Sequence, residues 1–207
     1  MYQVVQRFRY AVGVVDTSPK EQLLEAAIAY VSAHGIADLS LRRLAAEVGT
    51  SHRMLIHHFG SKQGLWVAMI QEVERRTLGT FVDLAPQDGG SFADTMRQWW
   101  AHLSDSRMWP TERLFFEVYG QALHADSLAR PLLDGIVEAW IGPAAETAEA
   151  LGVPADQARA YARLGLAVSR GLLLDLLATG DRAGCDAAME AWIALNLDHF
   201  GGATAPR

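Results

Sequence analysis

SLRRLAAEVGTSHRMLIHHFGSK, residues 40–62, contains the pattern that decides the fold of the N-terminal part of this chain. Ser40 can cap a first helix by accepting a backbone N–H, and apolar side chains then recur at i, i+3, i+4 and i+7. The residues on this apolar face are Leu41, Leu44, Ala45 and Val48. Gly49 stands where the chain must leave the helix, which glycine does without a Cβ penalty.

A second short helix follows the turn. Ser51 can cap it, and it runs to about Phe59. Its spacing predicts that Met54, Leu55 and Phe59 point inward, whereas His52, Arg53, Ile56 and His57 lie on the other side. Two such helices joined at a steep angle by a short turn are typical of a helix-turn-helix, whose second helix can enter the major groove of DNA.

This segment resembles the DNA-binding domain of the TetR family of bacterial transcription regulators. The resemblance covers roughly residues 18–69, and HFGSKQGLWVAM, residues 58–69, is its most specific part. Beyond it, only RGLLLDLLATGD, residues 170–181, is similar to the family. The matching residues are Leu23, Ala26, Ala27, Gly35, Ser40, Leu44, Ala45, Val48, Gly49, Ser51, Leu55, His58, Phe59, Ser61 and Lys62.

The resemblance implies a set of DNA-contacting residues. Arg53 and His52 are placed to reach base edges, and arginine can donate two hydrogen bonds to guanine. Lys62, at a helix N-terminus, suits a phosphate. His58 has an alternative role as a packed, hydrogen-bonded histidine at the junction of head and body. The full set is Ser40, Arg42, Ser51, His52, Arg53, His57, His58 and Lys62.

The chain departs from the family pattern at two positions, which leaves the operator sequence open. Ile56 stands where the family usually has a tyrosine that touches a phosphate, and isoleucine cannot donate a hydrogen bond. Thr50 replaces the usual apolar residue after the turn glycine. The three histidines of this helix do not suggest a metal site, because 57 and 58 face different directions and no cysteine or carboxylate joins them.

Composition bounds the class of protein. The 207 residues are half hydrophobic, which suffices for a small head and a larger body. Cys185 is the single cysteine, so no intramolecular disulfide can form and a reducing, cytoplasmic setting is expected. The sequence has no run of 18 apolar residues, and the N-terminus is a poor signal peptide. No cofactor, metal or membrane is expected as a partner.

Charge is divided unevenly along the chain, whose net charge is −6. Residues 1–62 hold seven Lys/Arg and five Asp/Glu, whereas residues 63–207 hold 11 Lys/Arg and 19 Asp/Glu. A basic head on an acidic body can present its cationic face to phosphate while the body stays off the DNA.

The remaining pattern predicts an all-α fold of nine or ten helices. Capping residues, glycines and prolines place helices over about residues 18–34, 40–48, 51–59, 62–84, 91–106, 110–125, 128–151, 154–179 and 184–200, with a break at Gly142–Pro143. The predicted division is a flexible arm over 1–17, a three-helix head with the helix-turn-helix over 18–60, and a larger helical ligand-binding and dimerisation body over 61–207. Arg7 and Arg9 of the arm could reach a minor groove, and a disordered tail is the alternative.

The body is expected to bind a small hydrophobic molecule. Eight of the 18 aromatic residues fall between residues 92 and 140, and the family encloses a small-molecule pocket in this region. Ordinary core packing is the alternative for each of them. The predicted lining is Met96, Trp100, Leu103, Phe116, Tyr119, Leu123 and Trp140, with Arg170 or Asp175 as polar anchors.

The last two helices are expected to form a homodimer, because the family pairs them with their symmetry mates in a four-helix bundle. The predicted dimer residues are Leu164, Ala167, Val168, Gly171 and Leu172 on one helix and Met189, Trp192, Ile193 and Asn196 on the other. A two-fold dimer would read double-stranded DNA with a palindromic operator.

Together these features predict a ligand-responsive regulator, most simply a repressor that leaves its operator when the effector binds. One alternative is a DNA-binding regulator whose body binds a protein partner or no effector. An enzyme is disfavoured because the sequence has no GxSxG, P-loop, GxGxxG or metal-ligand spacing, and Cys185 has no obvious histidine partner.

Overall fold

The computed structural model describes residues 18–35, 39–85 and 91–201, and the regular secondary structure in these ranges is entirely helical. The all-α prediction is therefore confirmed. The predictions for the N-terminal arm, Arg7 and Arg9 included, lie outside the described residues. In chain order the helices are α2 (Pro19–His34), α3 (Leu41–Glu47), α4 (His52–Phe59), α5 (Lys62–Leu84), α6 (Phe92–Leu103), α7 (Trp109–Ala122), the 3-10 turn η1 (Arg130–Leu133), α8 (Glu138–Ala150), α9 (Ala155–Thr179) and α10 (Arg182–Gly201).

Serines begin five of these helices, as the sequence predicts. A serine hydroxyl oxygen accepts the backbone N–H three residues further on at Ser18, Ser40, Ser51, Ser61 and Ser91. At α2 the Glu21 carboxylate also accepts the Ser18 N–H at 2.8 Å, which completes a capping box. Each cap satisfies an N–H that a helix start leaves unpaired, so short local patterns set where these helices begin.

The predicted break at Pro143 is wrong, because α8 continues through this residue. Proline removes one helical hydrogen bond and crowds the preceding turn. Packing offsets that cost: Trp140, Ile141 and Ala145 are buried, and α8 lies along α9. The helix also starts later than predicted, at Glu138, after η1.

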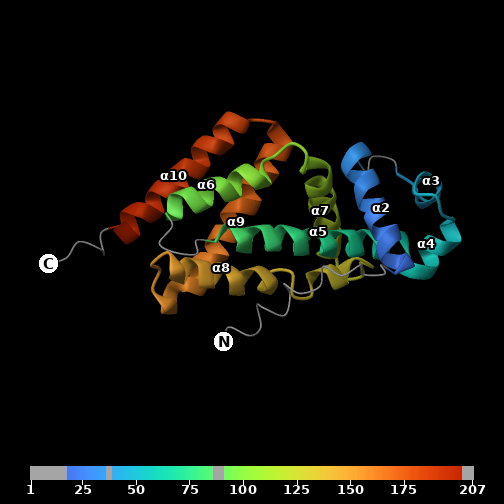
Figure 1. The fold of residues 1–207 in the computed structure, drawn as a ribbon, viewed down its shortest axis with the longest axis horizontal. Coiled ribbons are helices and arrows are strands. Elements are labelled where there is room, and N and C mark those ends of the chain that lie inside the picture. Colours follow the sequence, from blue (N-terminus) through green and yellow to red (C-terminus); the bar gives the residue numbers. More distant parts are fainter. Residues whose placement is uncertain (1–17, 36–38, 86–90, 202–207) are drawn as a thin grey trace.

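The helices fall into two regions joined by α5. Helices α2, α3 and α4 form the head at one end, and α5 to α10 form the body (Figure 1). Helix α5 contacts α2 and α4 of the head, and it contacts α6, α7, α8 and η1 of the body. A displacement of α5 therefore acts on both regions.

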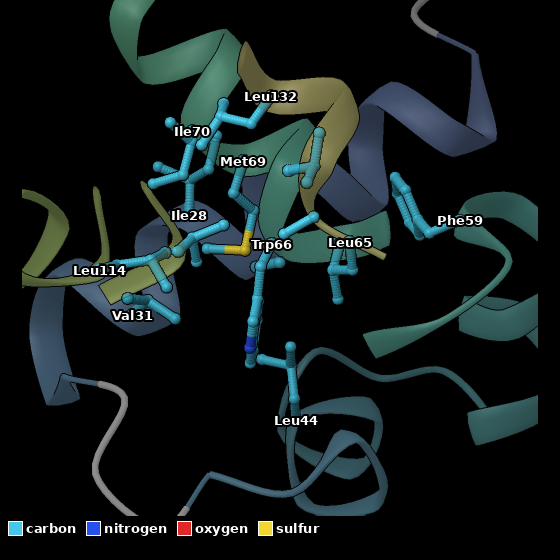
Figure 2. Packing of buried hydrophobic residues seen from close by; sticks show 14 of the residues in the cluster. Ile28, Val31, Leu44, Phe59, Leu65, Trp66, Met69, Ile70, Leu114 and Leu132 are labelled. Atoms are coloured by element: carbon cyan, nitrogen blue, oxygen red, sulfur yellow. The ribbon is translucent and has the colours of Figure 1, made fainter. Parts of the chain in front are cut away.

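One hydrophobic cluster crosses the boundary between head and body. Ile28 and Leu44 from the head meet Trp66 of α5, together with Leu114 of α7 and Leu132 of η1 (Figure 2). Each of these five side chains is at most 7% exposed. Burial of this apolar surface stabilises the contact between the head and the adjoining end of the body.

A second cluster fills the far part of the body. Phe81, Trp99 and Trp140 lie within it, from α5, α6 and α8, and Met189 and Ile193 of α10 complete one side. The three aromatic rings have centroids 5.0 to 5.9 Å apart. These rings form part of the walls of the pockets in the body.

Candidate functional site

The first feature is the outer face of α4, the second helix of the helix-turn-helix. His52, Arg53 and His57 are exposed there, as predicted. The facing of two neighbours is corrected: Met54 is 40% exposed and Ile56 is partly buried against the core. An eight-residue helix that rests on Leu55 and Phe59 has only a narrow buried stripe, and Ile56, not Met54, borders it.

Hydroxyl and cationic groups surround this face. Ser40 and Ser51 accept the N–H groups of Arg43 and Met54 at 3.2 Å, so each hydroxyl hydrogen remains able to donate to a phosphate. Arg42 is exposed on α3. Lys62 is exposed in the first turn of α5, where helix N–H groups also favour an anion.

The cations of the head differ from those of the body. Five of them are exposed, and within the described residues none forms an ion pair: Lys20, Arg42, Arg43, Arg53 and Lys62. By contrast, eight of the ten arginines in the described part of the body have a carboxylate partner, and only Arg113 and Arg130 among these ten do not. The eight are Arg75, Arg76, Arg97, Arg107, Arg159, Arg163, Arg170 and Arg182. The head therefore offers positive charge that is not already neutralised by the protein.

His58 is the exception among the predicted DNA-contacting residues. Its ring is partly buried beside His57 and Phe59, and its Nε2 is shielded from solvent. This placement supports the alternative of a packed histidine, but its predicted hydrogen bond is not seen, since Nε2 has no partner in the described structure. Seven of the eight predicted residues are thus accessible from outside.

The second feature is an apolar hollow in the body, called the outer pocket. It encloses about 660 Å³ of empty space, its open mouth included. Aromatic side chains dominate its walls, and the Trp192 Nε1 is buried there without a partner among the described atoms. Its lining is Phe81, Phe92, Met96, Trp99, Trp140, Ala144, Thr147, Ala148, Leu151, Val153, Tyr161, Ala162, Gly165, Leu166, Ser169, Trp192 and Asn196.

A smaller hollow, the inner pocket, adjoins it and contains charged groups. The two share Trp99, Trp140, Leu166 and Ser169 as walls, and the inner pocket adds Glu74, Thr77, Leu103, Glu112, Phe115, Phe116, Arg170 and Leu173. The Glu74 Oε2 accepts from Trp140 Nε1 at 2.9 Å and from an Arg170 guanidinium nitrogen at 3.1 Å. This guanidinium also lies over the rings of Phe115 and Tyr119, 5.1 and 5.8 Å from their centroids.

The two acids of the inner pocket differ in their partners. Burial raises the pKa of Glu74, against the opposing effects of Arg170 and Trp140. Burial and the nearby Glu74 raise the pKa of Glu112 from 4.5 to about 8, and Arg170 opposes this rise. Glu112 is 5% exposed and has no hydrogen bond or ion pair in the described structure.

Five of the nine predicted ligand-binding residues line these pockets. Met96 is in the outer pocket, Trp140 is in both, and Leu103, Phe116 and Arg170 are in the inner pocket. The other four lie elsewhere. Trp100 donates to Asp186 on α10 at 2.6 Å, Tyr119 lies beneath Arg170, Leu123 is 64% exposed, and Asp175 accepts from the Cys185 Sγ at 3.7 Å.

Sequence reasoning missed both acids, although each stands inside an apolar stripe. Glu112 precedes Phe115, Phe116 and Tyr119 at helical spacing, and Glu74 follows Ile70 by one turn. A carboxyl group on the buried face of a helix is a recognisable signal, because such groups are rarely buried without a partner or a function.

The predicted dimer residues of α9 and those of α10 point in different directions. Those of α9 lie on or beside its outer face, where Leu164 is 51% exposed and Ala167 and Gly171 are exposed. Those of α10 point into the chain itself: Met189, Trp192, Ile193 and Asn196 belong to the core or to the outer pocket. The side chains that α10 exposes instead include Ala187, Ala191, Ala194, Leu195 and Leu197.

Two other features, a membrane-spanning helix and a metal site, are not found in the described parts of the chain. No helix there is long and apolar enough to cross a membrane. Within the same residues, no group of three or more histidine, cysteine, aspartate or glutamate side chains is arranged to hold a metal ion.

The architecture is that of an all-α protein with a helix-turn-helix head and a helical body. Residues 23–69 match the family model of bacterial regulatory proteins of the tetR family. The chain is also similar to the HTH-type transcriptional repressor AcnR of Corynebacterium glutamicum, with 34% identity over 62 residues. That alignment spans 30% of this chain and about a third, 33%, of AcnR.

Solved structures resemble the chain over most of its length. A TetR-family transcriptional regulator of Pectobacterium atrosepticum has a TM-score of 0.70 at 18% identity, over 91% of this chain and 95% of that one. Salmonella enterica GusR has a TM-score of 0.64 at 21% identity, over 86% of this chain and 95% of that one. At these identities the likeness shows the fold. The head, residues 23–69, therefore matches the tetR family of bacterial regulatory proteins, and the chain over most of its length shares the fold of these solved structures. The matched family consists of transcription regulators and not enzymes.

Proposed function

We propose that this protein is a ligand-responsive transcriptional repressor. It binds a palindromic operator as a homodimer and leaves it when a small hydrophobic molecule occupies the body. The observation that carries the DNA-binding part is the set of exposed head cations, on and beside α4, that have no carboxylate partner in the part of the chain that the structure describes. Because its target is the bacterial chromosome, the protein acts in the cytoplasm.

In this proposal α4 lies in the major groove. Arg53 and His52, in its first turn, contact base edges, and an arginine that donates twice to guanine supplies sequence preference. Lys62 and the Ser40 hydroxyl contact phosphates, which position the head without reading sequence. His57, exposed further along α4, supplies the hydrogen bond to phosphate that Ile56 cannot make.

The outer faces of α9 and α10 form the proposed dimer interface. Leu164, Leu174 and Leu195 are 51%, 50% and 70% exposed, and small residues of these two helices, such as Gly171 and Ala191, are exposed as well. Small residues allow helices of two subunits to approach closely. A two-fold axis through such an interface sets the two recognition helices about 34–36 Å apart, which matches one turn of B-DNA.

Helix α5 links effector to operator in this mechanism. Its residues Glu74 and Thr77 line the inner pocket and Phe81 lines the outer pocket, while its first turn contacts α4. A ligand that favours a shifted α5 changes the spacing of the two heads. A coupling free energy of about 1–3 kcal/mol suffices to change DNA affinity about five- to 150-fold.

Fluorescence anisotropy with the gene's own upstream intergenic DNA tests the DNA-binding part. We expect nanomolar binding that falls steeply with salt and weakens by about 1–3 kcal/mol in Arg53→Ala. Arg130→Ala is the matched control, because Arg130 is an exposed arginine of η1 without an ion pair in the described structure. Binding no stronger than that of random DNA, or equal losses in both variants, would contradict the proposal.

Sedimentation tests the dimer with a second matched pair. Leu195→Arg places charge on the proposed interface, whereas Leu128→Arg changes a leucine of similar exposure, 68%, elsewhere on the body. We expect a dimeric mass for the wild type and Leu128→Arg, and a shift toward monomer for Leu195→Arg. A monomeric wild type at micromolar concentration would remove the basis for a palindromic operator.

A further inference from the structure

Glu112 is a buried acid for which the described residues supply no hydrogen bond or ion pair. Its side chain lines the inner pocket at 5% exposure, without a hydrogen bond or ion pair in the described structure. A buried carboxyl group without a partner costs free energy, and natural structures rarely retain one without a role. The missing partner is therefore a candidate ligand group.

The charges that face Glu112 leave an excess of acid. Glu74 comes from α5 and Arg170 from α9, and these two are already bonded to each other. The inner-pocket residues from α6 and α8, which include Trp99 and Trp140, carry no charge. Two carboxyl groups therefore face one guanidinium, and once Glu112 is ionised a single added positive charge balances the pocket.

The surroundings also favour a cation joined to an apolar body. Trp99 and Trp140 form walls of both pockets, and Phe81 packs against both rings at 5.0 and 5.9 Å between centroids. Aromatic faces attract cations through their negative quadrupole. The outer pocket beyond them is predominantly apolar and can receive the rest of the molecule.

We propose that the effector is a hydrophobic amine whose ammonium group binds Glu112 and whose apolar part occupies the outer pocket. This inference rests on the proposed function, because it specifies the chemical class of the ligand that releases DNA. It revises the expectation that Arg170 anchors the ligand, since Glu74 already holds that guanidinium.

Binding of the amine is coupled to the release of a proton from Glu112. Burial and Glu74 keep the pKa of Glu112 near 8, so the carboxyl group is mostly neutral at pH 7. An ammonium group favours the carboxylate, so the displaced proton passes to solvent. Affinity for the amine should therefore rise as pH increases from about 6.5 to about 8.5, and binding at pH 7 should release up to one proton.

Calorimetry on the full-length protein with three indole compounds of similar size tests this inference. Tryptamine carries an ammonium group, tryptophol a neutral hydroxyl, and indoleacetate a carboxylate. We expect tryptamine to bind at least about tenfold more tightly than tryptophol, with indoleacetate weakest. Titrations in two buffers of different ionisation enthalpy measure the proton release.

Two variants separate the role of Glu112 from general charge effects. Glu112→Gln keeps the shape of the side chain, and it should abolish both the preference for tryptamine and the proton release. Glu117→Gln on the same helix changes an exposed acid and should leave both unchanged. Because Glu112→Gln removes a buried titratable group, it should fold, and circular dichroism checks this.

The outcomes distinguish this inference from the proposed function. Equal affinity for tryptamine and tryptophol, no binding of any probe, or an unchanged preference in Glu112→Gln would overturn the amine assignment. If tryptophol rather than tryptamine released operator DNA, the repressor proposal would stand and the amine assignment would fail. If tryptamine bound at Glu112 without releasing DNA, the amine site would stand and ligand-controlled release would fail.

Discussion

Arg53 in the head and Arg170 in the body are the same residue type in opposite surroundings. Arg53 is exposed on a short helix and has no ion pair within the described residues. The Arg170 side chain is 20% exposed, is bonded to Glu74 and lies over two aromatic rings. The first cation is available to an external anion, whereas the second is committed to the interior.

Under the proposed function, this difference suits the protein to two partners of opposite character. Exposed charge loses little solvation when it meets a phosphate backbone, and it is free to adapt to that surface. Buried charge must be balanced in place, because desolvation of an unpaired ion is costly. The head is thus suited to a large polyanion, and the body to a small molecule that completes its charge balance.

The largest expected effect comes from breaking the buried pair. Glu74→Ala leaves Arg170 and the Trp140 Nε1 without their acceptor, so we expect the free energy of unfolding to fall by about 3–5 kcal/mol. Urea unfolding at fixed protein concentration measures it. The control is Glu25→Ala, which removes the exposed partner of Arg76 and should cost about 1 kcal/mol or less. Similar losses in both variants would show that burial does not distinguish these pairs.

The pH dependence of the free energy of unfolding tests whether Glu112 is buried and neutral. Its pKa is raised from 4.5 to about 8 in the folded protein, so the unfolded chain ionises first as pH rises. Stability due to this group is complete below about pH 4.5 and is lost between about pH 4.5 and pH 8. Relative to Glu112→Gln, the wild type should lose a few kcal/mol over this range in urea unfolding. Parallel curves for the two proteins would contradict a buried, neutral Glu112.

In the head, two cations should affect DNA binding in different ways. Arg53→Ala should cost about 1–3 kcal/mol of binding free energy on the operator and weaken the preference among sequences. Lys62→Ala should weaken binding to all sequences alike and reduce the salt slope by about one. Anisotropy with operator and shuffled DNA distinguishes these effects. A uniform loss in Arg53→Ala would reassign this arginine to a phosphate.

The smallest expected effect concerns the start of α4. Ser51→Ala removes the acceptor of the Met54 N–H, and an N-cap of this kind is worth about 1 kcal/mol. Thermal unfolding measures the loss, and Ser106→Ala, an exposed serine outside any helix, should change stability by no more than about 0.5 kcal/mol. A loss confined to DNA affinity would instead make Ser51 a contact residue without a capping role.

Local chemistry explains what sequence could predict about the fold. A serine before a helix and a glycine after it act within a few residues, and the five serine caps lie where the pattern places them. The prediction was wrong at Pro143, because packing of α8 against α9 outweighs the local preference of proline. The facing of Met54 and Ile56 was also wrong, since the angle at which a short helix meets its neighbours is not local information.

The sequence by itself determined the helix-turn-helix, the all-α class, the contrast of charge between head and body, and the serines that begin the helices. Each of these features depends on residues that lie close together in the sequence. Only the tertiary structure decided which aromatic rings line a pocket, that Glu74 holds Arg170, and that Glu112 has no hydrogen bond or ion pair among the described residues. Glu74, Glu112 and Arg170 come from three helices, and α5, α7 and α9 must pack together before their charges can interact. Burial and charge balance are properties of that packing, so no pattern along the chain specifies them.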